Sequence, residues 1–146
     1  MLTPSMILMI PFVTAVLTLA LGRWPLLQRA TSLLGSLLAL AAAITIFLRV
    51  DDGEFLVEQM GAWPAPFGIS LVIDRLAAVL VLITGFVGVV VNLYVQSPEQ
   101  RLTQGRDFHP LYQLLLAGVT GAFITGDFFN LFVFFEVMLI RSFVMM

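Results

Sequence analysis

Long apolar segments alternate with short polar ones along this chain of 146 residues. The apolar segments cover residues 4–21, 31–50, 76–95, 110–125 and 128–146. A bilayer core about 30 Å thick needs about 20 helical residues to cross it, and the first three segments reach that length. The fourth is shorter and takes in Pro110, which suits the first turn of a helix because no amide donor is needed there. We predict an all-α integral membrane protein with about five transmembrane helices, in a single membrane domain over residues 1–146.

The longest polar segment, residues 51–74, is predicted to lie on the extracytoplasmic side of the membrane. Residues 54–60 and 67–73 are rich in residue types that favour strands, and residues 61–66 separate them with one glycine and two prolines. This pattern predicts a β-hairpin-like loop, with Trp63 in the aromatic belt at the membrane surface. An irregular loop lying on the lipid headgroups is the alternative.

Composition strengthens the membrane assignment and removes most soluble-enzyme chemistry. Hydrophobic residues make up 60% of the chain, against about 45–50% in an ordinary globular domain. The net charge of −2 gives no reason to expect a nucleic-acid partner. With no cysteine and a single histidine, the chain cannot form a disulfide framework, a thiolate nucleophile or a cysteine metal site. We therefore expect no cofactor, no metal and no enzymatic activity.

The arginines predict the orientation of the helices, because cytoplasmic loops carry an excess of Lys and Arg. The loops at 22–30 and 97–110 each hold two arginines, whereas the loop at 51–74 is mainly acidic. No basic residue precedes the first apolar segment, which is the wrong charge order for a secretory signal peptide. We expect a multi-pass protein of the cell (inner) membrane, with its N-terminus outside and its C-terminus in the cytoplasm.

Glu136 is the outstanding functional candidate, because it is a carboxylate in the middle of an apolar segment. It follows Asp127 by nine residues (136 − 127 = 9), which places it about 13–14 Å below that membrane surface, near the centre of the bilayer. A charge there costs about 2.5–3.5 kcal/mol or more, so the group needs a partner or a water-filled cavity, or it keeps its proton. We interpret Glu136 as a proton-translocation residue. A protonated acid that bonds a neighbouring helix is the alternative.

Asp127 and His109 are further candidates near the two membrane surfaces. Asp127 follows Thr125 and Gly126, a pattern that ends one helix and begins the next. We expect a tight helical hairpin in which the Asp127 carboxylate caps the second helix, with ion entry as a second role. His109 is a candidate proton relay at the inner surface, and a solvated histidine at the start of a helix is the alternative.

Other polar residues in or beside the apolar segments are predicted to have structural roles. Arg141 lies about 140° round the helix from Glu136, too far for an ion pair, and is expected to extend towards the inner interface. Asp74 is expected to cap the third helix. Four more side chains either line a polar path or bond backbone carbonyls, namely Thr84, Asn92, Thr120 and Thr125.

Two stretches of the chain resemble a known family of transport proteins. One is AWPAPFGISLVIDRLAA at residues 62–78, and the other is FHPLYQLLLAGVTGAFITGDFFNLFVFFEVMLI at residues 108–140. The second is the more specific, since it joins an aspartate-ended helical hairpin to the sequence NLFVFFE. Together they resemble the D subunit of the Mrp-type multisubunit Na+/H+ antiporters, which is related to the proton-pumping antiporter-like subunits of respiratory complex I. The resemblance covers nearly all of this chain but a third or less of a full-length member.

The resemblance implies monovalent cation and proton transport within a hetero-oligomeric membrane complex. It implies that Glu136 matches the glutamate of the family's fifth helix, which works with a lysine on a later helix. This chain contains no lysine, and residues 141–146 depart from the family pattern. We therefore expect the N-terminal portion of an antiporter subunit, as a truncated product or a partial gene model would give. The expected partners are other membrane subunits, lipid, protons and monovalent cations.

Two alternatives stay open at this point. The first is a proton-pumping membrane subunit of a complex I-type NADH-quinone oxidoreductase, in which pumping is coupled to quinone reduction. The second is a non-transporting membrane assembly protein, in which the Glu136 carboxyl serves only for packing between helices.

Overall fold

The computed structural model describes residues 3–61, 63, 68–101 and 105–145. The elements in chain order are α1 (Pro4–Ala20), α2 (Pro25–Asp51), β1 (Leu56–Met60), β2 (Ile69–Ile73), α3 (Arg75–Val95), α4 (Pro98–Arg101), α5 (Phe108–Ile124) and α6 (Phe128–Met145). The prediction of a mainly helical protein is confirmed, and the two strands form the single sheet of the described residues.

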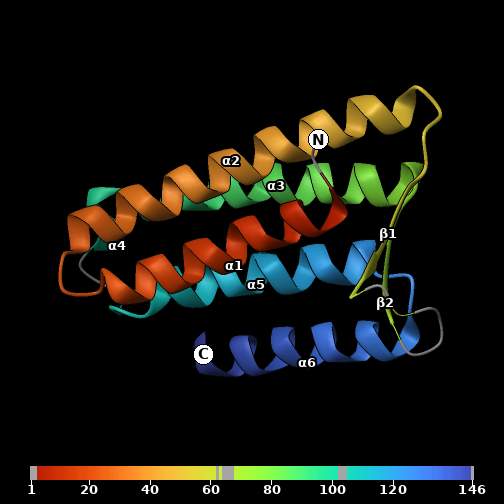
Figure 1. Cartoon of the computed structure of the whole chain (residues 1–146). Helices are drawn as coiled ribbons and strands as arrows, with labels where there is room; N and C mark the ends of the chain where they lie inside the picture. Colours follow the sequence, from red (N-terminus) through yellow and green to blue (C-terminus); the bar gives the residue numbers. More distant parts are fainter. Residues whose placement is uncertain (1–2, 62, 64–67, 102–104, 146) are drawn as a thin grey trace.

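The five long helices of the described residues are α1, α2, α3, α5 and α6. They lie side by side, and the two strands cross one end of them (Figure 1). The second helix, α2, packs against α1 and α3, and α5 packs against the same two helices. At the edge of the assembly, α6 packs mainly against α5 (Figure 1). A four-helix bundle of α1, α2, α3 and α5 therefore forms the centre of the molecule, and α6 has one packed face.

The apolar core lies next to the sheet. It joins residues from the helices of the bundle to the inner face of β2, and its members with at most 1% exposure are Ala43, Ile46, Leu71, Ile73, Ala78 and Ile124. Alternate residues of a strand point to opposite faces, so Leu71 and Ile73 both point into the core while their neighbours do not. The sheet thus covers the end of the bundle.

The hairpin predicted from the sequence is present, with shorter strands than expected. The strands β1 and β2 pair antiparallel, with Leu56 opposite Ile73 and Met60 opposite Ile69. Gly61 leaves β1 with a φ of 80°, a backbone conformation that glycine adopts without steric cost. Trp63 is exposed, as a residue at a membrane surface would be. Most of the predicted turn, residues 62 and 64–67, lies outside the described residues.

Hydrogen bonds from both strands hold the hairpin on the helix ends. The Glu58 carboxylate accepts hydrogen bonds from the backbone N–H and the hydroxyl of Ser5, each at 2.8 Å, in the first turn of α1. This contact satisfies a free amide at the helix start and places a negative charge at the positive end of the helix dipole. On the other strand, the Ser70 carbonyl accepts from the N–H of Gly126 at 2.8 Å, in the α5–α6 turn.

Several predicted boundaries need correction. The second helix begins at Pro25 rather than at residue 31, because it extends beyond the apolar stretch with Pro25 in its first turn, where proline is well suited. The fourth begins at Phe108 rather than at residue 110. The loop predicted at 97–110 contains the short helix α4, which begins at a proline. Apolar patterning marks the part of a helix that crosses the membrane, whereas the helix itself continues into the polar flanks.

Length and composition make two of the helices, α2 and α3, suitable for crossing a membrane, and α1 and α5 are shorter apolar helices of 17 residues each.

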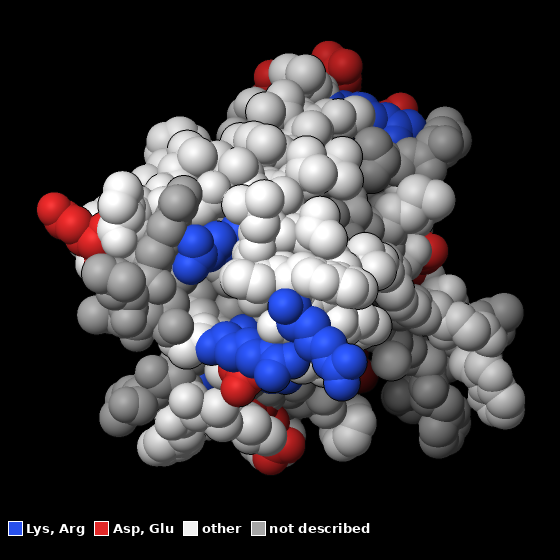
Figure 2. Space-filling model, turned by 90° about the vertical axis from the view of Figure 1, so that its left-hand side faces the viewer, with Lys and Arg blue, Asp and Glu red and all other residues white. Residues whose placement is uncertain are grey.

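Charge is unevenly distributed between the ends of the bundle. The end away from the sheet carries Arg23, Arg29 and Arg106, and Figure 2 shows arginine side chains gathered there. The sheet end carries most of the carboxylates, including Asp51, Asp52, Glu54, Glu58 and Asp74.

The Glu58–Ser5 contact can be tested by substitution. Glu58→Ala removes the acceptor for two hydrogen bonds, and we expect it to lower the stability of the fold by about 1–2 kcal/mol. Glu58→Gln keeps an acceptor oxygen and should cost less. Thermal unfolding in lipid nanodiscs measures both. Glu54→Ala, an exposed carboxylate that precedes the same hairpin, is the control; equal losses for Glu54→Ala and Glu58→Ala would contradict the role given to Glu58.

Candidate functional site

Glu136 lies on the face of α6 that is turned away from α5. Asn130 and Phe134 of α6 are buried against the bundle, and Glu136 follows Phe134 by about 200° round the helix. The side chain is exposed, and no hydrogen bond or ion pair joins it to a described residue. Its neighbours on this face are exposed and apolar, namely Phe132, Val133, Phe135, Leu139 and Ile140. Within this chain the carboxylate is therefore surrounded by apolar side chains and is not enclosed by protein.

The α5–α6 turn fixes where α6 begins. The Asp127 carboxylate accepts a hydrogen bond from the N–H of Phe129 at 3.2 Å, and its carbonyl accepts from Leu131 at 2.9 Å. The Thr125 hydroxyl accepts a bond from the Asn130 amide at 3.1 Å. These are the contacts of a capped helix start. They place Asp127 at the sheet end of the molecule, one helix length from Arg23, Arg29 and Arg106.

A very close contact between α5 and α6 sets the direction in which Glu136 points. The Phe134 ring lies directly over Gly121 of α5, in space that a β-carbon at that position would occupy. Gly118, one turn earlier, faces Met138 in the same way, with 3.0 Å between an added β-carbon and Met138 Cγ. Small residues let helix backbones approach closely in membranes. Because this contact fixes the rotation of α6, it also fixes Glu136 on the opposite face.

A buried polar layer crosses the bundle between α2, α3 and α5. The Asn92 amide donates to the Ser36 hydroxyl at 2.6 Å, and its oxygen accepts from the Ser32 hydroxyl at 3.0 Å. The Gln113 amide donates to the Ser32 carbonyl at 2.8 Å and also contacts both serine hydroxyls, at 3.1 and 3.0 Å. All four side chains are at most 1% exposed. Such a layer holds three helices in one register, because a shift would leave buried polar groups unpaired.

His109 lies at the end of the bundle away from the sheet, in the first turn of α5. The side chain is buried, with 3% of its surface exposed. The alternative of a solvated histidine is therefore wrong. Neither ring nitrogen has a hydrogen-bond partner among the described residues. The Phe108 ring packs edge-on against it, with 5.6 Å between the ring centroids. The structure thus places His109 and Glu136 in different parts of the molecule, on the first turn of α5 and the middle of α6.

The remaining predicted polar residues have mainly structural contacts. Asp74 caps α3 as predicted, with its carboxylate accepting from the N–H of Ala77 at 2.7 Å. Thr84 donates to the Leu80 carbonyl of its own helix. Arg141 lines a groove between α1, α5 and α6 that also includes Asp107. Across the described part of the chain, no group of three or more acidic or histidine side chains could hold a metal ion.

Sequence reasoning missed most of the polar layer. It considered Asn92 only as a path-lining or backbone-bonding residue, and it passed over Ser32, Ser36 and Gln113. Two signals were available in the sequence. Ser32 and Ser36 are four residues apart, so they share one face of a helix, and Gln113 is a long polar side chain inside an apolar segment, where it needs a partner.

The α5–α6 contact gives a direct test of the site's geometry. Gly121→Ala places a methyl group where the Phe134 ring lies, so we expect α6 to separate from α5 and the unfolding midpoint of the chain to fall by several degrees, from a loss of about 1–3 kcal/mol. Gly105→Ala is the control, because an added β-carbon there meets no atom within 4 Å. An unchanged midpoint for Gly121→Ala would show that the helices are not in close contact.

Curated relatives include proteins from several bacteria, and no protein-family model matches the chain. The chain is 41% identical over 143 residues to the D subunit of a Na(+)/H(+) antiporter of Alkalihalophilus pseudofirmus, covering 94% of this chain and 28% of the relative. It is 53% identical over 87 residues to the D subunit of a probable K(+)/H(+) antiporter of Rhizobium meliloti, covering 60% and 16%. It is 35% identical over 139 residues to the N subunit of an NADH-quinone oxidoreductase of Desulforudis audaxviator, covering 92% and 28%.

Two solved membrane complexes contain chains of the same fold. One is the Mrp complex from Dietzia sp. DQ12-45-1b, with a TM-score of 0.81, 30% identity and coverage of 95% of this chain and 26% of that one. The other is the archaeal membrane-bound sulfane sulfur reductase, with a TM-score of 0.84, 28% identity and coverage of 97% and 29%. This chain is accordingly a multi-pass membrane protein that spans a little over a quarter of the length of such relatives. In sequence and in fold, it is similar to the D subunits of Na(+)/H(+) antiporters, and it is also similar in sequence to the N subunit of an NADH-quinone oxidoreductase.

Proposed function

We propose that this chain forms the N-terminal part of a membrane subunit in a multisubunit monovalent cation/proton antiporter, and that Glu136 carries protons there. The observation that carries the proposal is the 41% identity to an antiporter D subunit across 94% of the chain. Exchange of cations for protons requires the whole complex. We propose that this chain contributes the four-helix bundle, helix α6 and the Glu136 carboxylate to it. Sodium is the cation named for that relative and potassium for another, so we propose a monovalent cation as the exchanged ion.

The position of Glu136 supports this assignment. A carboxylate on an apolar helix face is expensive to leave against lipid, and such residues usually face protein or a water-filled cavity. The face around Glu136 is rich in exposed aromatic side chains, which are of the kind that pack against further helices. The relatives carry more than two thirds of their length outside the matched part. We propose that helices in a region corresponding to that unmatched part cover this face of α6 and supply the basic partner of Glu136.

The membrane placement follows from the same features. We propose that α1, α2, α3, α5 and α6 cross the bilayer, that the hairpin lies on the extracytoplasmic side and that the N-terminus is outside. The arginines at the end away from the sheet support a cytoplasmic location for that end (Figure 2). Other membrane subunits and lipid are the proposed partners, and Asp127 lies at the proposed outer surface.

A complex I-type pump is the second candidate function, because the N subunit of an NADH-quinone oxidoreductase is 35% identical over 92% of this chain. In that setting Glu136 would have the same proton-carrying role, but electron transfer to quinone would drive it. Cation dependence separates the two: an antiporter needs a monovalent cation gradient for proton flux, whereas a respiratory pump needs NADH and quinone.

Glu136→Gln tests the proton-carrying role. The glutamine keeps the size and hydrogen-bonding capacity of the side chain but cannot release a proton, so we expect cation-dependent proton flux in vesicles containing the whole antiporter complex to fall about 10²-fold or more. Glu99→Gln, the same change at an exposed residue of α4, should leave the flux unchanged. Normal flux with Glu136→Gln would contradict the proposal, and loss of complex assembly would favour a packing role.

Asp127 can be examined with two substitutions. Asn caps a helix about as well as Asp, so Asp127→Asn should preserve thermal stability, whereas Asp127→Ala should lower it by about 1 kcal/mol. If the carboxylate also attracts cations or protons at the outer surface, Asp127→Asn should still raise the cation concentration needed for half-maximal flux. An unchanged concentration in Asp127→Asn would leave capping as the whole role of the residue.

A further inference from the structure

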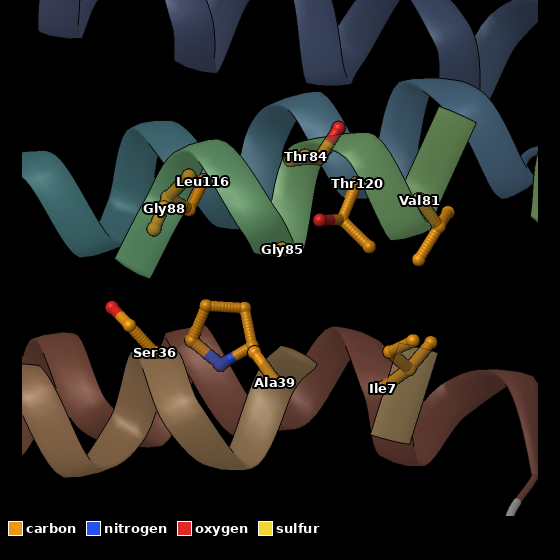
Figure 3. Close-up of a pocket in the computed structure, with 10 residues that line it drawn as sticks. Ile7, Ser36, Ala39, Val81, Thr84, Gly85, Gly88, Leu116 and Thr120 are labelled. Carbon is orange, nitrogen blue, oxygen red and sulfur yellow. The ribbon is translucent and has the colours of Figure 1, made fainter. Parts of the chain in front are cut away.

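The interior of the four-helix bundle has little room for a ligand. The cavity at its centre, between α1, α2, α3 and α5, has a volume of about 20 Å³ and is lined mostly by apolar residues and glycines (Figure 3). That volume is enough for about one water molecule. Any larger molecule that binds the bundle must therefore do so on its surface.

A surface groove of suitable size lies between α1 and α6, with α5 as its floor. Its volume is about 320 Å³, which is within the range of small-molecule sites. The α1 wall consists of residues three or four positions apart, which share one face of the helix, namely Phe12, Ala15, Val16 and Leu19. Leu111 and Leu114 of α5 lie on the floor. The groove is thus apolar along most of its length.

The groove fits an acyl chain better than a further helix. Its α1 wall, from Phe12 to Leu19, is about 10 Å long. A helix about 10 Å in diameter would need about 800 Å³ over that length, more than twice the volume of the groove. A chain of methylene groups is narrower and can follow the apolar wall. In a bilayer such chains are at hand, but apolar contact alone does not select one lipid over another.

Two arginines lie where the groove ends, at the end of the bundle away from the sheet. On the α1 side, Gly22 and Arg23 follow Leu19 by three and four residues. On the α5 side, Arg106 precedes Asp107, which lines the groove. The Arg106 side chain lies against Gly22, because a β-carbon added there would be 3.0 Å from Nε and 3.4 Å from Nη2 of Arg106. The Arg106 guanidinium therefore bridges the ends of the two helices, and Figure 2 shows arginine side chains gathered on this face.

A buried glutamine fixes the backbone that carries Arg106. Gln28 of α2 is 4% exposed, and its amide donates to the Arg106 carbonyl at 3.0 Å and to the Thr18 carbonyl of α1 at 2.9 Å. These two bonds join the segment before α5 to the last turns of α1. The backbone of Arg106 is thus held in place before a ligand binds, which lowers the entropy that binding costs.

The guanidinium groups of Arg23 and Arg106 have no carboxylate partner in the described part of the chain. Asp107 and Arg141 both line the groove and balance each other in charge, so the two arginines leave a net positive charge at its end. A guanidinium matches the geometry of phosphate oxygens and bonds them in pairs. The end of the groove therefore suits a phosphate group, and the groove beside it suits an apolar chain.

We propose that an anionic phospholipid occupies this site, with its phosphate group at Arg23 and Arg106 and one acyl chain in the groove. Basic pockets between transmembrane helices bind the head groups of anionic lipids in this way. The bound lipid joins α1 to α5 and α6 at the membrane surface. The proposal rests on the membrane location of the chain and not on the proposed role of Glu136.

The two tryptophans of the chain report on the lipid near each end of the bundle. Trp24 follows Arg23, whereas Trp63 follows β1 of the hairpin, so Trp63→Phe and Trp24→Phe each leave one reporter. The full chain is placed in vesicles of phosphatidylglycerol and phosphatidylcholine in equal amounts, with quenching bromine atoms on the acyl chains of one lipid. We expect phosphatidylglycerol to be enriched about five-fold or more beside Trp24, the factor for one basic residue at a membrane surface, and not beside Trp63. Equal quenching of Trp24 by the two lipids would overturn the proposal.

Substitution of the arginines tests which groups hold the phosphate. With Trp24 as the reporter, Arg23→Gln and Arg106→Gln should each lower the enrichment of phosphatidylglycerol about five-fold. Arg75→Gln, the same change at the sheet end, should leave it unchanged. Full enrichment with both Arg23 and Arg106 replaced would overturn the proposal. The comparison of Trp24 with Trp63 needs no arginine variant, so it stands even where a variant fails to fold.

Two further measurements separate the lipid from other occupants. Glycerol 3-phosphate has the phosphate but no acyl chain, so it should not displace phosphatidylglycerol at millimolar concentration; displacement would point to a soluble phosphate ligand and overturn the proposal. Val16→Phe fills the groove at an exposed wall residue without a change of charge, and it should lower the enrichment beside Trp24. Unchanged enrichment, or a helix of the complex seated in the groove in a density map, would overturn the place given to the acyl chain.

Discussion

Polar groups inside an apolar bundle must find partners, and this requirement organises the molecule. Between α2, α3 and α5, hydrogen bonds join the side chains of Ser32, Ser36, Asn92 and Gln113, and Oε1 of Gln113 is the one buried atom of this layer that has no partner among the described residues. Lipid gives no hydrophobic drive for helices to associate, so hydrogen bonds and close packing decide which helices meet and in what register. The polar layer fixes the register of the helices in the half of the bundle away from the sheet. The apolar core fixes it in the half beside the sheet. The two regions together make a rigid support.

Rigidity of the four-helix bundle has a consequence for α6. This helix packs mainly on α5, and the contact of Gly121 with Phe134 fixes its rotation. Its outer face, with Glu136 among aromatic side chains, is then held in one orientation relative to the bundle. The bundle thus holds the Glu136 carboxylate in one position, and no described residue of this chain bonds it. Such a carboxylate is suited to pair with a group on a helix outside the described residues. That arrangement agrees with the homology to the D subunits of multisubunit antiporters.

Sequence patterns predicted the helices well and the contacts between them poorly. Apolar segments located five helices because their length must match the bilayer, and glycine and proline located the hairpin turn. Helix starts were missed where polar residues continue a helix beyond the membrane, as at Pro25. Glu136 was recognisable because a single charge in an apolar segment is rare, but its exposure within this chain depends on the rotation of α6. The Gln113 contacts join residues 77 to 81 positions apart, which no local pattern reveals.

The central claim is that Glu136 gains and loses a proton during transport. Infrared difference spectroscopy of the whole antiporter complex, recorded as the cation concentration is changed, measures that step directly. The account predicts a carboxyl band that changes with the cation and is absent when Glu136 is replaced by glutamine. A spectrum in which the cation-dependent carboxyl signal is identical with and without Glu136 would contradict it.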